Sequence, residues 1–225
     1  MRRLLSILFA GAVLAAPALS TAQAASDFPT RPIRLVVGFA PGGATDTLAR
    51  LLTGALGQEL GQTIFVENIA GASGLIGWRN VAAATPDGYT LLMAENAVAI
   101  RPGFKDMTPS FEPVTQLEAV ASVAHSPLAL CVADNVPANN VKELIALSRS
   151  TEKKLNYASA GNGSVALLVW EVVKDGANIE AVSVPYRGGG SAMAAIIAGQ
   201  VDIIMASSQV AKPLVEAKRL SLIHI

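Results

Sequence analysis

Short apolar runs and longer amphipathic stretches alternate along most of the chain. The short runs are rich in β-branched residues, which is typical of buried strands, whereas the longer stretches repeat apolar residues at helical spacing. Turns rich in Gly, Pro and Asn separate them. We therefore expect strands at residues 33–38, 64–66, 89–93, 120–123, 128–132, 155–157, 182–184 and 203–205, and helices at residues 46–60, 74–84, 141–150, 165–174 and 191–198.

The regular order of strand, glycine-bearing loop and helix predicts an α/β protein with parallel sheets covered on both faces. This order lapses between residues 101 and 111, where Pro, Gly and polar residues prevail, and then resumes. We therefore expect the chain to pass there from a first lobe, residues 25–122, to a second lobe, residues 123–219.

The first residues have the pattern of a secretory signal peptide. A positively charged start precedes an apolar run over residues 4–19, which is short for a membrane span. Ala22 and Ala24 then supply small residues at the spacing of a cleavage site. We expect cleavage after Ala24, which removes residues 1–24 and exports the rest of the chain.

Charge and cysteine content argue against several functions. The 17 Lys and Arg residues balance the 17 Asp and Glu residues, so the chain lacks the positive field that nucleic acids require. Cys131 is the only cysteine and lies in an apolar run, which predicts a buried thiol. His125 and His224 are the only histidines. Few candidates for a catalytic base are therefore present, which argues against a Cys-His or Ser-His-Asp enzyme. We expect no cofactor and no metal site.

Glycine-rich loops carry the candidate chemistry. Residues 38–45 have the spacing of a phosphate-binding P-loop, but Ala44 occupies the lysine position, which argues against a nucleoside triphosphate. Backbone N–H groups at a helix N-terminus suit a smaller anion such as a carboxylate, and Thr45 or Asp46 is the expected N-cap. In open α/β sheets the ligand crevice lies at the carboxyl ends of the strands. Such loops on two facing lobes would therefore hold a small anion.

Five longer motifs follow one another along residues 28–219. They are Phe-Ala-Pro-Gly-Gly-Ala-Thr-Asp at residues 39–46, Pro-Asp-Gly-Tyr-Thr at 86–90, Lys-Leu-Asn-Tyr-Ala-Ser-Ala-Gly-Asn-Gly-Ser at 154–164, Val-Pro-Tyr-Arg-Gly-Gly at 184–189 and Gly-Gln-Val-Asp at 199–202. This ordered set resembles the Bug family, the extracytoplasmic solute-binding receptors of tripartite tricarboxylate transporters.

The resemblance implies a two-lobe periplasmic-binding-protein fold of the type II kind, with a hinge between the lobes. It implies a periplasmic receptor, not an enzyme, that is monomeric when full-length and delivers a small organic carboxylate to membrane permease subunits. Loop backbone and ordered water would hold the ligand, and Arg187 would either pair with it or lie solvated on its loop. The ligand-binding residues implied by position are Phe39, Ala40, Pro41, Gly42, Gly43, Thr45, Asp46, Asn96, Ser159, Ala160, Asn162, Gly163, Ser164, Tyr186, Arg187 and Gly188.

The resemblance also implies a fold that is incomplete at the C-terminus, because family members continue and return to the first lobe. Residues 220–225 read Leu-Ser-Leu-Ile-His-Ile, which matches the translation of a transposon-end sequencing adapter. We expect this hexapeptide to be an artefactual tail, and resequencing the locus would test that.

Two other functions remain open. A ligand sensor that docks on a membrane kinase would share the fold and the ligand, and gene neighbours would distinguish it. A hydrolase with Ser164 or Ser191 as nucleophile is the other alternative. It is disfavoured because residues 71–75 and 189–193 lack the last glycine of a nucleophile elbow and because usable histidines are scarce.

Overall fold

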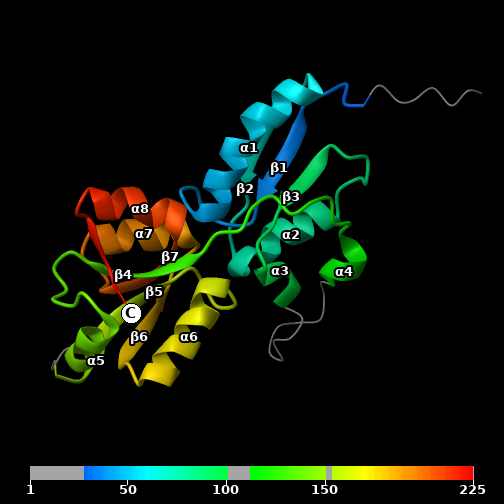
Figure 1. Cartoon of the computed structure of the whole chain (residues 1–225). Helices are drawn as coiled ribbons and strands as arrows, with labels where there is room; N and C mark the ends of the chain where they lie inside the picture. The colour runs from blue at the N-terminus through cyan, green and yellow to red at the C-terminus, as the bar shows by residue number, and fades with distance from the viewer. Residues whose placement is uncertain (1–27, 101–111, 151–153, 225) are drawn as a thin grey trace, which may run out of the picture.

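The structure, a computed structural model, describes residues 28–100, 112–150 and 154–224. These residues form two lobes, each built around its own sheet, as Figure 1 shows. The two-lobe α/β architecture expected from the sequence is confirmed. The expected signal peptide, residues 1–24, lies outside the described residues.

A three-stranded parallel sheet forms the first lobe, with the strand order β2-β1-β3. Its elements are β1 (Ile33–Val37), α1 (Ala44–Leu60), β2 (Ile64–Asn68), the 3₁₀ turn η1 (Ala72–Gly74), α2 (Leu75–Ala82) and β3 (Thr90–Met93). Leu35 and Val37 of β1 are buried in a core that includes Ala49 of α1. Arg34 points the other way and donates to Glu67 at 2.9 Å and to Asn80 of α2 at 2.8 Å. The two helices therefore cover opposite faces of the sheet.

An extended connection over residues 117–127 leads to the second lobe, after the short helices α3 (Ala97–Ile100) and α4 (Pro113–Gln116). The strand expected at residues 120–123 is wrong, and Val120 is 84% exposed. A strand needs a neighbour that pairs with its backbone N–H and C=O groups, and none of the described strands pairs with this run. An apolar run alone does not supply that neighbour.

The second lobe has a five-stranded sheet with the order β6-β5-β7-β4-β8. Its elements are β4 (Leu128–Ala133), α5 (Val141–Ser150), β5 (Leu155–Ser159), α6 (Val165–Ala177), β6 (Ala181–Pro185), α7 (Gly189–Ile197), β7 (Ile203–Ser207), α8 (Ser208–Glu216) and β8 (Leu220–Leu222). Strands β5, β6 and β7 are parallel, but β4 is antiparallel to both β7 and β8. The expectation of a purely parallel sheet is therefore wrong here, because β4 enters from the connection and not from a strand-helix crossover.

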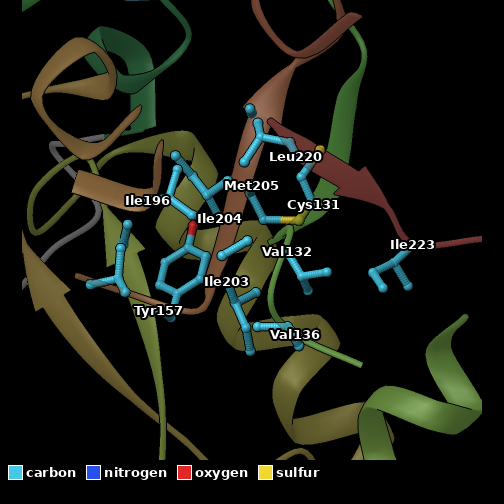
Figure 2. Close-up of a cluster of buried hydrophobic side chains, with 14 of the residues drawn as sticks. Cys131, Val132, Val136, Tyr157, Ile196, Ile203, Ile204, Met205, Leu220 and Ile223 are labelled. Carbon is cyan, nitrogen blue, oxygen red and sulfur yellow. The ribbon is translucent and has the colours of Figure 1, made fainter. Parts of the chain in front are cut away.

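The second lobe also has the larger apolar core, part of which Figure 2 shows. Cys131 is fully buried there, as expected, and burial raises the pKa of its thiol to about 11. The ring of Tyr157 stacks on that of Trp170, with their centroids 4.5 Å apart. Leu220 and Ile223 are also buried in this core. Alternating apolar residues suffice for an edge strand such as β8, so the origin of residues 220–225 stays a prediction.

Candidate functional site

The loops at the carboxyl ends of the strands in one lobe face the corresponding loops of the other. The N–H of Ala40, after β1, donates to the carbonyl of Arg187, after β6, at 3.4 Å. The Ser73 hydroxyl, in the loop after β2, donates to the carbonyl of Asn162, after β5. These contacts join four loops across the gap between the lobes, which is the arrangement expected for an α/β ligand crevice.

A cavity of about 350 Å³ lies between these loops. The first lobe contributes its η1 loop, and the second lobe contributes the loops that follow β5 and β6. The lining residues are Gly71, Ala72, Ser73, Ala160, Gly161, Asn162, Pro185, Tyr186 and Arg187. A larger hollow of about 430 Å³ lies at the last turns of α1 and the start of β2. That hollow is at the opposite ends of the strands, so we take the cavity between the lobes as the candidate site.

The loop before α1 ends at Gly43, which is the N-cap of the helix and has extended backbone angles. No side chain caps this helix end, so the expectation that Thr45 or Asp46 is the N-cap is wrong. The helix begins earlier than the sequence suggested, and Asp46 lies within its first turn. From there the Asp46 carboxylate accepts the N–H of Gly42 at 2.9 Å.

Asp46 is nearly buried and lies at the centre of a polar network. Arg50 donates to both of its oxygens at 2.9 and 3.1 Å, and the Asn68 amide donates at 2.9 Å. Asn68 also donates to the carbonyl of Phe39 at 3.0 Å. Burial alone would raise the pKa of Asp46, but hydrogen bonds from Arg50, Gly42 and Asn68 and the charge of Arg50 lower it below its ordinary value. The network therefore fixes the backbone of the loop before α1, and the Asp46 carboxylate at its centre is ionised.

Buried serines organise the loop after β5. The Ser159 hydroxyl accepts the N–H of Gly161 at 3.1 Å. Ser164 is the N-cap of α6, and its hydroxyl accepts the N–H of Leu167 at 3.3 Å. Both serines are only 1% exposed. Their side chains therefore shape the loop, and the loop backbone lines the cavity.

The η1 loop has an unusual backbone. Four consecutive residues, Gly71 to Gly74, have positive φ angles, including Ala72 at 47° and Ser73 at 54°. Such angles cost about 1–3 kcal/mol for a residue with a side chain and persist where surrounding contacts enforce them. Trp78 packs so close to Gly74 that a Cβ there would lie 2.6 Å from the ring. This packing and the contact between Ser73 and Asn162 hold the loop in place.

All but one of the predicted binding residues fall into three groups, and Asn96 stands apart from them. Four of them line the cavity: Ala160, Asn162, Tyr186 and Arg187. Phe39, Thr45, Asp46, Ser159 and Ser164 are nearly buried, and Phe39 belongs to the first-lobe core. Ala40, Pro41, Gly42, Gly43, Gly163 and Gly188 lie in the facing loops, and Asn96 lies at the start of α3, outside the cavity lining.

Arg50, Asn68 and Ser73 were missed by the sequence reasoning. Asn68 is the last residue of β2 and Ser73 follows it in the adjacent loop. Their position at the carboxyl end of a strand next to β1 was the signal that could have identified them. The signal for Arg50 was its place four residues after Asp46 in the expected helix, a spacing that brings an acidic and a basic side chain together.

Charge in the candidate site comes mainly from Arg187. Its side chain makes no ion pair with any other described residue. Glu95 follows β3, and burial raises its pKa to about 7. Among the described residues, no cluster of three His, Cys, Asp or Glu side chains could hold a metal ion.

No helix in the described ranges has the length and apolar character needed to cross a membrane. Helix α1, for example, carries Asp46, Arg50 and Glu59 along its length.

Comparison with known proteins gives consistent matches. A family model described as "Tripartite tricarboxylate transporter family receptor" matches residues 48–225. A curated protein of Bordetella pertussis, from the group named UPF0065, is 38% identical over 180 residues, which cover 80% of this chain and 55% of that protein. The chain thus spans little more than half the length of this curated relative.

Two solved structures from Rhodopseudomonas palustris are also similar. Rpa4515 with adipate has a TM-score of 0.82 and 31% identity. MatC with bound malate has a TM-score of 0.77 and 32% identity. Each comparison covers 87% of this chain and 66% of the solved chain.

Proposed function

The chain belongs to the tripartite tricarboxylate transporter receptors, the family that its motifs resemble, and on this premise we propose that it captures a small organic carboxylate between its lobes. In this proposal the exported protein binds its ligand in the periplasm and delivers it to membrane permease subunits. BugD, a periplasmic binding protein, has the same fold, which supports the proposed periplasmic location.

Arg187 is the observation that carries the proposal. It lines the cavity between the lobes, and its guanidinium has no anionic partner among the described residues. A guanidinium binds a carboxylate through two parallel charge-assisted hydrogen bonds. The loop that lines the cavity at Asn162 leads into the start of α6, whose helix dipole has its positive end there. An anion placed there meets donors and positive potential.

The size of the cavity favours a small ligand. A volume of about 350 Å³ is near the lower end of the range for small-molecule sites. Adipate and malate, which are bound in two of the similar structures, are both short dicarboxylates. We propose a mono-, di- or tricarboxylate of similar size for this chain.

We propose binding without turnover. The two serines considered as nucleophiles both have structural partners: Ser164 caps α6, and the Ser191 hydroxyl donates to the carbonyl of Gly188 at 3.0 Å. Ser164 is also 1% exposed, which keeps its oxygen from a ligand. These partners support a receptor over a hydrolase.

A thermal-shift screen of carboxylates, including adipate and malate, tests the proposal. A ligand present at a hundred times its dissociation constant should stabilise the chain by about 2.7 kcal/mol. Absence of a shift with every carboxylate would overturn the proposed ligand class. Co-purification of the chain with its permease subunits would test the delivery step.

Arg187→Ala tests the role of the guanidinium. Loss of a charge-assisted pair of about 1.5–3 kcal/mol should weaken the affinity for the best carboxylate roughly ten- to hundredfold in calorimetric titration. Arg79→Ala is the matched control, because Arg79 is exposed on α2 and lies outside the cavity lining. Equal affinities of the two variants would show that backbone and water alone bind the anion.

A further inference from the structure

The first turn of α7 rests directly on the loop before α1, in the opposite lobe. A Cβ atom at Gly190 would lie 1.9 Å from the carbonyl oxygen of Pro41 and 3.1 Å from the carbonyl carbon of Gly42. Both are backbone atoms, so no side-chain rotation could make room. The two lobes can therefore approach this closely only if residue 190 has no side chain.

Backbone conformation does not explain the glycine at this position. Gly190 lies inside α7 and has no positive φ angle, so an alanine would fit its local geometry and favour the helix. Gly188 differs, because its φ of 146° favours glycine whatever its surroundings. The absence of a side chain at residue 190 therefore matters only when the lobes are in contact.

Gly189 is the natural comparison. It precedes Gly190 in the same helical turn, but a Cβ there would lie 3.8 Å from the Cα of Gly43, which is an ordinary van der Waals distance. Adjacent glycines in one helix thus differ sharply in what they allow. While the lobes are in contact, residue 189 has room for a methyl group and residue 190 does not.

We infer that Gly190 is a positioning residue for ligand capture, because it permits the backbone contact through which the two lobes close. The inference rests on the proposed function, since a ligand between the η1 loop and the Arg187 loop is held from both sides only when the lobes meet. A methyl group at residue 190 holds the lobes apart and leaves each lobe folded. The closed state is then lost without loss of any ligand-binding side chain.

Dyes on the two lobes measure closure directly. We would attach them at Glu59→Cys on α1 and Asp175→Cys on α6, both of which are exposed. Cys131 is buried with a thiol pKa of about 11, so it stays unlabelled at neutral pH. Single-molecule energy transfer then reports the fraction of molecules with closed lobes, with or without a ligand.

Gly190→Ala should lose the high-transfer population and bind adipate or malate at least tenfold more weakly, with an unchanged or higher melting temperature. Gly189→Ala should match the parent in transfer and affinity, again with an unchanged or higher melting temperature. A closed population in Gly190→Ala equal to that of the parent would overturn the inference. If no variant binds either carboxylate, the ligand assignment fails, and the transfer histograms without ligand still decide the role of Gly190.

Discussion

Asp46 combines burial with a negative charge beside the loop of the first lobe on which α7 of the second lobe rests. Its carboxylate is occupied by the N–H of Gly42, the guanidinium of Arg50 and the amide of Asn68. With these partners its charge is compensated within the first lobe. The residue therefore acts on the site indirectly, by fixing the backbone between Phe39 and Gly43, which contacts the opposite lobe.

Asp46→Asn should loosen this loop. Because the neutral amide cannot accept all of these donors, we expect the free energy of unfolding to fall by about 1–3 kcal/mol in urea titration, together with weaker carboxylate binding. Asp87→Asn is the control, since Asp87 pairs with the exposed Arg31 and its loss should cost less than about 1 kcal/mol. Equal losses in the two variants would contradict the role given to Asp46.

The same residue should make stability depend on acidity. Folding lowers the pKa of Asp46 below its ordinary value of 3.8, so the folded state favours the ionised form. This stabilisation is present in full above that value and disappears as the pH falls through it towards the folded pKa. The difference in unfolding free energy between the parent and Asp46→Asn should therefore shrink below about pH 4. A difference that persists in strong acid would show that the charge is not its source.

At the scale of single elements, the start of α5 has a reciprocal cap. The Asn140 side chain accepts the N–H of Glu143 at 2.9 Å, and the Glu143 carboxylate accepts the N–H of Asn139 at 2.8 Å. Asn140 is therefore the residue whose side chain caps α5. Two backbone donors are thus satisfied at the helix end.

Asn140→Ala removes this cap and should lower the free energy of unfolding by about 0.5–2 kcal/mol, measured by chemical denaturation. Lys142→Ala in the same helix turn is the comparison, because Lys142 is exposed and alanine favours a helix. If the two variants unfold at the same denaturant concentration, the cap contributes nothing measurable.

Most elements could be predicted from the sequence because local pattern determines them. Apolar runs with β-branched residues became β1, β2 and β7, and stretches with helical spacing became α1 and α5. The direction of β4 and the absence of a strand at residues 120–123 could not be predicted, because both depend on which strands lie alongside in three dimensions. A local pattern contains no information about such neighbours.

The candidate site, too, could be predicted from the sequence only in part. Arg187 and Asn162 line the cavity, and the resemblance to the family had implied both by position. The bond from Ser73 to Asn162 and the approach of Gly190 to Pro41 involve residues far apart in the chain. Only the packing of one lobe on the other brings these groups together.

At the scale of the whole molecule, the described residues form two lobes that should differ in stability. The first has a three-stranded sheet, and Leu51 and Phe65 on its α1 and β2 are 71% and 45% exposed. The second has a five-stranded sheet and a larger buried core. Since burial of apolar surface is the main source of stability, the first lobe should unfold more readily than the second.

The two tryptophans allow this to be measured, because each lobe holds one of them, fully buried. Trp170→Phe leaves Trp78 to report on an unaltered first lobe, and Trp78→Phe leaves Trp170 to report on an unaltered second lobe. In urea we expect the fluorescence of Trp78 to change at a lower concentration than that of Trp170. Each substitution perturbs only the lobe that is not observed, so the two midpoints belong to intact lobes. Coincident midpoints that also match the circular dichroism transition of the parent would show that the lobes unfold as one cooperative unit.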